Sequence, residues 1–331
     1  MTPLPNMARR RALQLAAASG LGASFGALAQ TSLAPLRLIV GFPPGGATDV
    51  VARYLAEAMR TRLKRTVLVE NKPGAAARIA AEYLKSAPAD GSVILVTPNP
   101  VVTQYPSVYR KLSYDPVRDL EPLAMVASYP LLISVGPAVP ASVRSIKDYV
   151  QWAKSGPRNG FFASPAAGST PHFVGLMLGR AAGVELTHVP YRGDAPAVQD
   201  MLGGQVPMSI NVPVAQLPHI ATGKLRVLAT TGERRMPELA QVPTMIEEGY
   251  PALQTSDWFG TFLPAGTPAA VAARLQAVIQ DSLQDPLVRE SFAKQGITPA
   301  FVPAPEFAKR IRRERTEFAA TVQKIGFTPE E

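Results

Sequence analysis

The chain has 331 residues, with 34 Lys plus Arg against 25 Asp plus Glu, only three His and no Cys. The lack of Cys excludes thiol nucleophiles, disulfide bonds, iron–sulfur clusters and Cys-ligated zinc. Three His argue against a multi-histidine metal centre, so we expect neither a metal nor a cofactor. The length suits two domains, and an apolar content of 47% is enough for a large core. The 33 Pro predict many short loops and exclude a bundle of long helices.

The N-terminal segment has the pattern of an export signal. Arg9, Arg10 and Arg11 precede an uncharged, Ala-rich segment over residues 12–28, and residues 27–29 form a small-x-small cleavage site. The segment is too short and too Ala-rich to span a membrane well. The pattern predicts a signal peptide over residues 1–29, cleaved near Ala29, with the Sec and twin-arginine routes as alternatives. We therefore expect an exported protein of the periplasm.

The net charge of +9 does not by itself indicate nucleic-acid binding. The basic residues are scattered, and no basic motif interleaved with aromatic residues occurs. The one dense group, at residues 310–315, is interpreted as the solvated face of a C-terminal helix. We expect no nucleic-acid partner.

Alternating strands and helices organise the chain. The first half predicts strands at 36–40, 67–69 and 93–96, a helix from Thr48, and a helix at 75–86. After a strand at 131–135 the pattern begins again, with helices at 145–155 and 196–202, a helix opened by residues 164–171, and strands at 160–163 and 225–229. This order predicts an α/β fold of two lobes separated by a cleft, each lobe a mainly parallel sheet flanked by helices.

The last part of the chain predicts helices without an obvious sheet of their own. Thr267 and Pro268 suit a helix start, and Pro305 begins the final helix. We expect these helices to cover the first lobe, which is then discontinuous. The expected division is a first lobe of residues 30–133 plus 254–331 and a second lobe of residues 134–253.

Two strand-to-helix turns, at residues 42–49 and 164–172, carry the candidate chemistry. Both offer small residues and a hydroxyl at a helix start, where unpaired N–H groups and the positive end of the helix dipole attract an anion. One such turn is a weak indication, but one turn in each lobe predicts a site that grips the two ends of a small carboxylate.

Other interpretations of the same residues are weaker. The first turn lacks the Gly-x-Gly-x-x-Gly of dinucleotide sites and the Gly-Lys-Ser/Thr of a P-loop. Asp49 is interpreted as capping its helix or orienting its turn rather than meeting an anion. Ser169 and His172 could form a nucleophile and base, but there is no Gly-x-Ser-x-Gly elbow and no acid evidently placed to orient the His. Asp194 and Asp200 do not form the carboxylate pair of glycoside hydrolysis. We therefore predict no catalytic residue.

A series of short motifs resembles the Bug family, the extracytoplasmic solute receptors of tripartite tricarboxylate transporters. The resemblance runs in order over nearly the whole chain after the leader. Its motifs are Leu38-Ile39-Val40-Gly41-Phe42-Pro43-Pro44-Gly45-Gly46-Ala47-Thr48-Asp49, Val69-Glu70-Asn71-Lys72-Pro73-Gly74-Ala75, Val189-Pro190-Tyr191-Arg192-Gly193, Leu202-Gly203-Gly204-Gln205-Val206, Leu217-Pro218-His219-Ile220 and Trp258-Phe259-Gly260.

The resemblance implies a two-lobed periplasmic binding protein, of the type II-like Venus flytrap kind, that closes on its ligand without chemical reaction. In relatives the two turns hold a ligand carboxylate through main-chain N–H groups and ordered water. The implied partners are a small carboxylate, the transporter subunits in the membrane and, for some relatives, a sensor kinase. The predicted ligand-binding residues are Phe42, Gly45, Gly46, Ala47, Thr48, Asp49, Thr97, Ser164, Gly168, Ser169, Thr170, His172, Arg192, Gly193, Asp194 and Asn211.

Three positions depart from the pattern of the resembling family. Arg78 either adds a cation to the cleft or points to solvent. Asp194 stands where relatives carry a small residue, and it would favour a ligand with an amine or hydroxyl over one with a second carboxylate. Asn211 removes a charge that relatives usually have. The leading function is a receptor for a small organic acid, and the alternatives are a periplasmic hydrolase using the same cleft and a sensor-coupled receptor.

Overall fold

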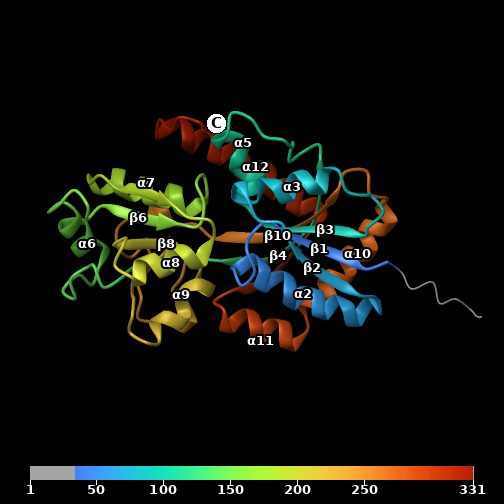
Figure 1. Ribbon diagram of the computed structural model, residues 1–331, viewed down its shortest axis with the longest axis horizontal. Coiled ribbons are helices and arrows are strands. Elements are labelled where there is room, and N and C mark those ends of the chain that lie inside the picture. Colours follow the sequence, from blue (N-terminus) through green and yellow to red (C-terminus); the bar gives the residue numbers. More distant parts are fainter. Residues whose placement is uncertain (1–33, 331) are drawn as a thin grey trace, which may run out of the picture. The chain divides into compact units, whose positions relative to one another are not determined.

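The computed structural model describes residues 34–330, which contain two β-sheets (Figure 1). The predicted signal peptide lies outside the described residues. The first sheet has the strand order β11 (Thr298–Pro303), β4 (Leu120–Tyr129), β10 (Asp257–Pro264), β3 (Val93–Pro98), β1 (Leu36–Val40) and β2 (Val67–Asn71). The second sheet has the order β7 (Thr187–Pro190), β6 (Phe161–Ser164), β8 (Met208–Asn211), β5 (Leu132–Val135) and β9 (Arg226–Thr230).

The predicted α/β class is confirmed, and the pairing within both sheets is mixed rather than mainly parallel. β1 pairs in parallel with β2 and β3, and β6 pairs in parallel with β7 and β8. Every antiparallel pair contains β4, β5 or β10. The chain passes from the first sheet to the second between β4 and β5, and returns between β9 and β10. Repeated strand–helix–strand units give the parallel pairs, whereas β10 and β11 in the first sheet and β5 in the second run opposite to the parallel strands.

Helices lie against both sheets. Those that accompany the first sheet are α2 (Ala47–Leu63), α3 (Arg78–Lys85), α4 (Pro100–Thr103), α5 (Tyr105–Val108), α10 (Ala269–Leu283), α11 (Pro286–Lys294) and α12 (Ala304–Lys324). Those that accompany the second are α6 (Ile146–Ala153), α7 (Thr170–Ala182), α8 (Asp194–Leu202) and α9 (Pro213–Ile220). Among residues 34–330, no helix has both the length and the apolar character to cross a membrane.

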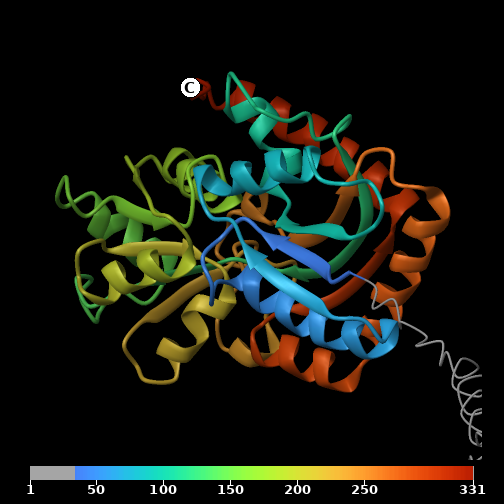
Figure 2. The same cartoon turned by 45° about the vertical axis from the view of Figure 1, so that its right-hand side comes forward.

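The C-terminal part contains strands that the sequence analysis missed. The sequence analysis predicts helices in this part, whereas the structure also has the strands β10 and β11, both paired with β4. β10 is buried along its whole length and lacks polar–apolar alternation, so its residues carry no period of two. The helices α10 and α12 contact β4, and α11 lies beside α2 (Figure 2).

The starts of α8 and α10 differ from the predicted ones by two residues and by one residue. α8 begins at Asp194 rather than at Pro196, because Gly193 has a φ of 114° and turns the chain directly into the helix. α10 begins at Ala269, since Pro268 has the extended ψ of 134° and flanks the helix instead of beginning it. The first shift places the Asp194 side chain in the first turn of α8.

The two chain crossings are held together by one buried threonine. The Oγ1 atom of Thr231 accepts a hydrogen bond from the N–H group of Leu131 at 2.9 Å and donates one to the carbonyl of Thr255 at 2.8 Å. The backbone of Thr231 also pairs with Leu131 and with Thr255. Both segments that join the sheets therefore share one hydrogen-bonded cluster, which fixes how the strands enter and leave each sheet.

Gly175 allows α7 to approach β6 closely (Figure 1 shows both elements). A Cβ atom at this position would overlap the ring of Phe162. We expect Gly175→Ala to lower the free energy of unfolding by about 1–3 kcal/mol through overpacking, although Ala favours a helix by about 1 kcal/mol. Urea unfolding measures the difference, and adding Phe162→Leu should recover part of it. A Gly175→Ala variant as stable as the wild type would show that α7 does not depend on this contact.

Candidate functional site

A small, mostly apolar cavity lies where the turn from β1 to α2 meets the turn from β6 to α7. Its volume is about 40 Å³. Most of its lining comes from aromatic side chains and prolines. Its polar lining residues are Thr48, Ser169, Asp194 and Asp257. The cavity therefore joins the two turns that the sequence analysis singled out, and we call it the central cavity.

Asp49 shapes the turn before α2. Its carboxylate accepts hydrogen bonds from the N–H group of Gly45 at 2.9 Å, from the Asn71 amide at 2.9 Å and from Arg53 at 2.7 Å. Burial raises the pKa of Asp49, but the donors Arg53, Gly45 and Asn71 outweigh it and hold the pKa below its ordinary value. This agrees with the interpretation that Asp49 orients its turn.

Asp194 reaches from α8 to the start of α2. Its Oδ2 atom accepts a hydrogen bond of 3.0 Å from the N–H group of Ala47, the first residue of α2. Asn211 donates to the main-chain carbonyl of Asp194 at 3.2 Å and so holds the start of α8. Burial raises the pKa of Asp194 to about 6, against a smaller opposing effect of the Ala47 hydrogen bond. A carboxyl group from the second sheet's helices thus meets the N-terminus of a helix on the first sheet.

Asp257, at the start of β10, makes the reciprocal contact. Its carboxyl group accepts a hydrogen bond from the Asn99 amide at 3.1 Å, and the same amide donates to the hydroxyl of Thr170, the first residue of α7, at 3.4 Å. Gln104 donates to the same Thr170 hydroxyl at 2.7 Å. Burial raises the pKa of Asp257 to about 7, more than the polar groups of Thr170 and Asn99 lower it. In both of these contacts an acid on one sheet's side is linked to the first residue of a helix on the other sheet, Asp194 directly and Asp257 through Asn99.

The start of α7 is fixed by contacts within its own turn. Ser169 donates its hydroxyl to the carbonyl of Ala166 at 2.7 Å, and Nδ1 of His172 accepts from the N–H group of Gly168 at 3.1 Å. The His172 ring stacks on His188, with centroids 3.7 Å apart. Burial lowers the pKa of His172 to about 4, so the ring is neutral near pH 7. Ser169 and His172 each have another partner, and their arrangement is not that of a nucleophile bonded to its base.

The structure brings some predicted site residues to the central cavity and not others. Those that line it are Phe42, Ala47, Thr48, Ser169 and Asp194. Two others lie on a neighbouring cavity of about 700 Å³, Arg192 and Gly193, which Phe42 also lines. Thr170 lines a third cavity. The remaining predicted residues support the turns from behind or lie within them: Gly45, Gly46, Asp49, Thr97, Ser164, Gly168, His172 and Asn211.

The 700 Å³ cavity also contains Arg78, whose position the sequence left open. The Arg78 guanidinium lies 3.8 Å from the ring centroid of Tyr109, and its Nε atom donates to the carbonyl of Ala75 at 3.0 Å. Residues 75–77 are all Ala with positive φ, which is strained for a residue with a side chain. Arg78 therefore adds a cation to this cavity but not to the lining of the central one.

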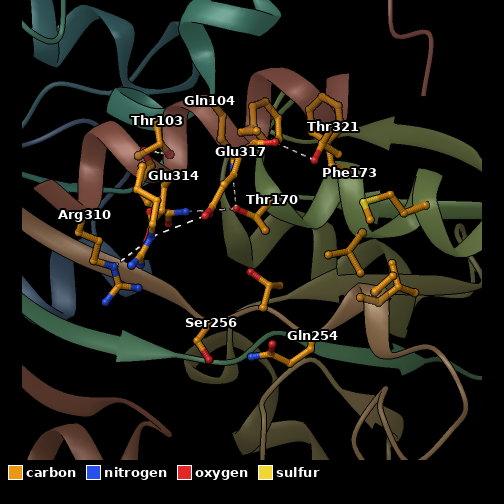
Figure 3. A pocket seen from close by; sticks show the side chains of 18 residues that line it. Thr103, Gln104, Thr170, Phe173, Gln254, Ser256, Arg310, Glu314, Glu317 and Thr321 are labelled. Atoms are coloured by element: carbon orange, nitrogen blue, oxygen red, sulfur yellow. Dashed lines mark hydrogen bonds and ion pairs between the residues drawn. The ribbon is translucent and has the colours of Figure 1, made fainter. Parts of the chain in front are cut away.

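The third cavity, of about 410 Å³, lies between α7, α12 and residues 252–256 (Figure 3). Its polar wall carries Glu314, which accepts hydrogen bonds from Arg310 at 2.6 Å and from Nε1 of Trp258 at 2.8 Å. Thr170 borders it and is linked to Asp257 through the Asn99 amide (Figure 3 shows Thr170).

Three important lining residues were not predicted: Tyr129, Asp257 and Phe259. Tyr129 and Phe259 stack with centroids 4.6 Å apart at the end where β4 pairs with β10. The one sequence feature that could have indicated Asp257 is an acid directly before the apolar run of residues 258–259, because acids seldom lie within buried strands.

Known proteins of this architecture are similar to the chain over most of its length. The family model described as "Tripartite tricarboxylate transporter family receptor" matches residues 51–327. Protein BugT of Bordetella pertussis is 34% identical over 294 residues, which cover 88% of this chain and 89% of BugT. The structure of the periplasmic binding protein BugD has a TM-score of 0.84 at 32% identity, covering 89% of this chain and 99% of BugD. The structure of the R. palustris protein Rpa4515 with adipate has a TM-score of 0.86 at 30% identity, covering 90% of this chain and 99% of Rpa4515.

The Asp49 cluster yields a stability prediction. Asp49→Ala leaves the Gly45 N–H group without its acceptor and removes one of the two acceptors of the Asn71 amide, so we expect the free energy of unfolding at pH 7 to fall by about 2–3 kcal/mol. Because the folded pKa lies below the unfolded one, this contribution is present above the usual pKa of Asp and is lost as the pH falls through the folded pKa. Urea unfolding at pH 7 and pH 3 should show the difference shrink in acid. The exposed Asp281→Ala, on α10, is the matched control and should be nearly neutral.

The two buried acids predict the opposite pH dependence. Between the unfolded pKa of 3.8 and the folded values of about 6 and about 7, the folded state holds more protons, so stability falls as the pH rises. For Asp194 alone, the raised pKa corresponds to about 3 kcal/mol above pH 6. The double variant Asp194→Asn/Asp257→Asn should flatten the profile of unfolding free energy from pH 5 to pH 8. Asp200→Asn, on α8, should leave the profile unchanged, and an unaltered slope in the double variant would contradict this assignment.

Proposed function

The chain belongs to the tripartite tricarboxylate transporter receptor family, and we propose that it captures a small organic acid between its two sheets and delivers it to a membrane transporter of that type. The observation that carries the proposal is the convergence of two helix starts, those of α2 and α7, on one buried cavity. Helix starts present unpaired N–H groups and the positive end of the helix dipole, which suit a carboxylate. The relative solved with adipate supports a carboxylate ligand.

The proposed binding is non-covalent and leaves the acid unchanged. Micromolar affinity requires about 8 kcal/mol, and a few charge-assisted hydrogen bonds of about 1.5–3 kcal/mol each could supply it with burial of the ligand. Thr48 and Ser169 are the polar side chains of the cavity that carry no charge. We assign them, with the main-chain N–H groups of their turns, as ligand contacts.

We propose that the two sheets mark two lobes that close on the ligand. The first lobe would comprise residues 30–133 and 254–331, and the second residues 134–253. The crossings between β4 and β5 and between β9 and β10 are then the hinge, and Thr231 joins them. A central cavity of about 40 Å³ is too small for adipate, so ligand entry requires the lobes to move apart.

Periplasmic location and export complete the proposal. The relative BugD is a periplasmic binding protein, and residues 9–29 have the composition of a cleavable export signal. Cleavage near Ala29 would release the receptor domain.

Ligand binding should raise the melting temperature of the purified protein, because a ligand that binds only the folded state stabilises it by RT ln(1 + [L]/Kd). At a hundredfold excess over Kd this is about 2.7 kcal/mol. The screen uses mono-, di- and tricarboxylates, aromatic acids and amino acids, with mass spectrometry to verify that the acid is unchanged. Thr48→Val should weaken binding by about fivefold to tenfold, since a hydrogen bond contributes about 1 kcal/mol.

Thr61→Val is the control, because Thr61 lies on the same helix and its hydroxyl donates to the exposed carbonyl of Glu57. No melting-temperature shift with any carboxylate would contradict the proposed receptor for organic acids. Chemical conversion of a bound acid would contradict the transport role and favour an enzyme. Loss of uptake of the same acid in cells that lack the chain tests delivery to the transporter.

A further inference from the structure

One end of the central cavity already holds an anion supplied by the protein. The Asp194 side chain is half-buried, and its carboxyl group lies 3.0 Å from the Ala47 nitrogen at the start of α2. Ala47 and Asp194 are 147 residues apart and belong to helices on different sheets. Under the proposed function, the start of α2 is one of two places for a ligand carboxylate, and Asp194 occupies it.

Neighbouring residues hold the main chain at Asp194 in place. Gly193 precedes it with a φ of 114°, and Asn211 holds its main-chain carbonyl at 3.2 Å. Pro43 lies 3.5 Å from the place of a Cβ atom on Gly193, so the start of α8 lies against the turn before α2. The carboxyl group is therefore aimed at α2 by contacts on both sides of the cavity.

The charges around the cavity also oppose a dianion. Among residues 34–330, its lining includes two acids, Asp194 and Asp257, and no Lys, Arg or His. Arg78 and Arg192 line the neighbouring 700 Å³ cavity instead. A dicarboxylate would place two negative charges beside these acids with no basic side chain to balance them, and like charges in a buried site repel strongly.

We infer that Asp194 is a specificity-determining residue, which substitutes for one carboxylate of the ligand at the start of α2, so that the receptor takes a monocarboxylate with a hydroxyl or amino group at its other end. This inference rests on the proposed function. The single ligand carboxylate then lies at the α7 end, beside Ser169. Its far end donates a hydrogen bond to the Asp194 carboxylate, which accepts from Ala47 on its other side.

Two length-matched series of acids test this inference on the purified full chain. Each compares a monocarboxylate, its ω-hydroxy acid and the dicarboxylate: butyrate, γ-hydroxybutyrate and succinate, then hexanoate, ω-hydroxyhexanoate and adipate. Calorimetric titration at pH 8 gives the affinities. We expect the best-bound ω-hydroxy acid to exceed the dicarboxylate of equal length by about tenfold or more.

Asp194→Asn keeps the shape of the side chain and an acceptor for Ala47, but removes the charge. It should lower the preference for the hydroxy acid over the dicarboxylate by about tenfold or more, mainly by improving dicarboxylate binding. Asp200→Asn, an acid on α8 outside the cavity, should leave the preference unchanged. Asp257→Asn tests the second acid in the same way.

The outcomes separate this inference from the proposed function. A wild-type chain that binds the dicarboxylate at least as tightly as the hydroxy acid overturns the inference and leaves the receptor for organic acids in place. A preference that Asp194→Asn does not change also overturns it, because another residue then sets the selection. If no carboxylate binds to any variant, the proposed function fails together with the inference.

Discussion

The buried start of α2 imposes the constraint on which the site depends. A main-chain N–H group at a helix start has no partner within its helix, and burying it without an acceptor is costly. In this protein the Ala47 N–H group finds its acceptor in Asp194, from a helix on the other sheet. Its neighbour in the turn, the Gly45 N–H group, is satisfied locally by Asp49. The contact between the two sheets' helices thus also supplies the hydrogen-bond acceptor that the start of α2 needs.

The mixed pairing of the sheets places these termini opposite each other. Parallel units around β1 and β6 direct α2 and α7 away from the same end of their strands, as in other open α/β sheets. β10 runs opposite to β4 and to the parallel strands of its sheet, so the end of β4 and the start of β10 lie together and bring Tyr129 and Asp257 to the cavity. Thr231 holds both crossings together at the base. The lining is therefore drawn from segments far apart in sequence, joined by the topology.

The sequence predicted the local parts of this arrangement and missed the long-range ones. The turns at residues 42–49 and 164–172 are visible because Gly and Pro interrupt apolar runs directly before a helix. β10 and β11 were missed, since a fully buried strand and a Pro-flanked edge strand have no period of two. Asp257 was not predicted because it begins β10, a strand without a recognisable period. The contact of Asp194 with Ala47 could not be predicted either, because the two residues are 147 positions apart and a local sequence pattern carries no information on such a contact. Thr97 and Ser164, which the sequence analysis also places in the site, are buried at the ends of β3 and β6.

Two acids near the start of α2 show how position decides the role of one side-chain type. Asp49 has three donors, Gly45, Asn71 and Arg53, which stabilise its charge and lower its pKa. Asp194 has a single main-chain donor in an apolar cavity, and burial raises its pKa to about 6. A carboxylate with all its partners shapes a turn and has no capacity left for a ligand. A carboxylate with one partner keeps acceptor capacity inside the cavity, and a ligand that donates to it relieves the cost of its burial. Asp49, whose hydrogen-bonding capacity is used within the protein, therefore has a structural role. Asp194, which keeps free acceptor capacity, is the acid able to select a ligand.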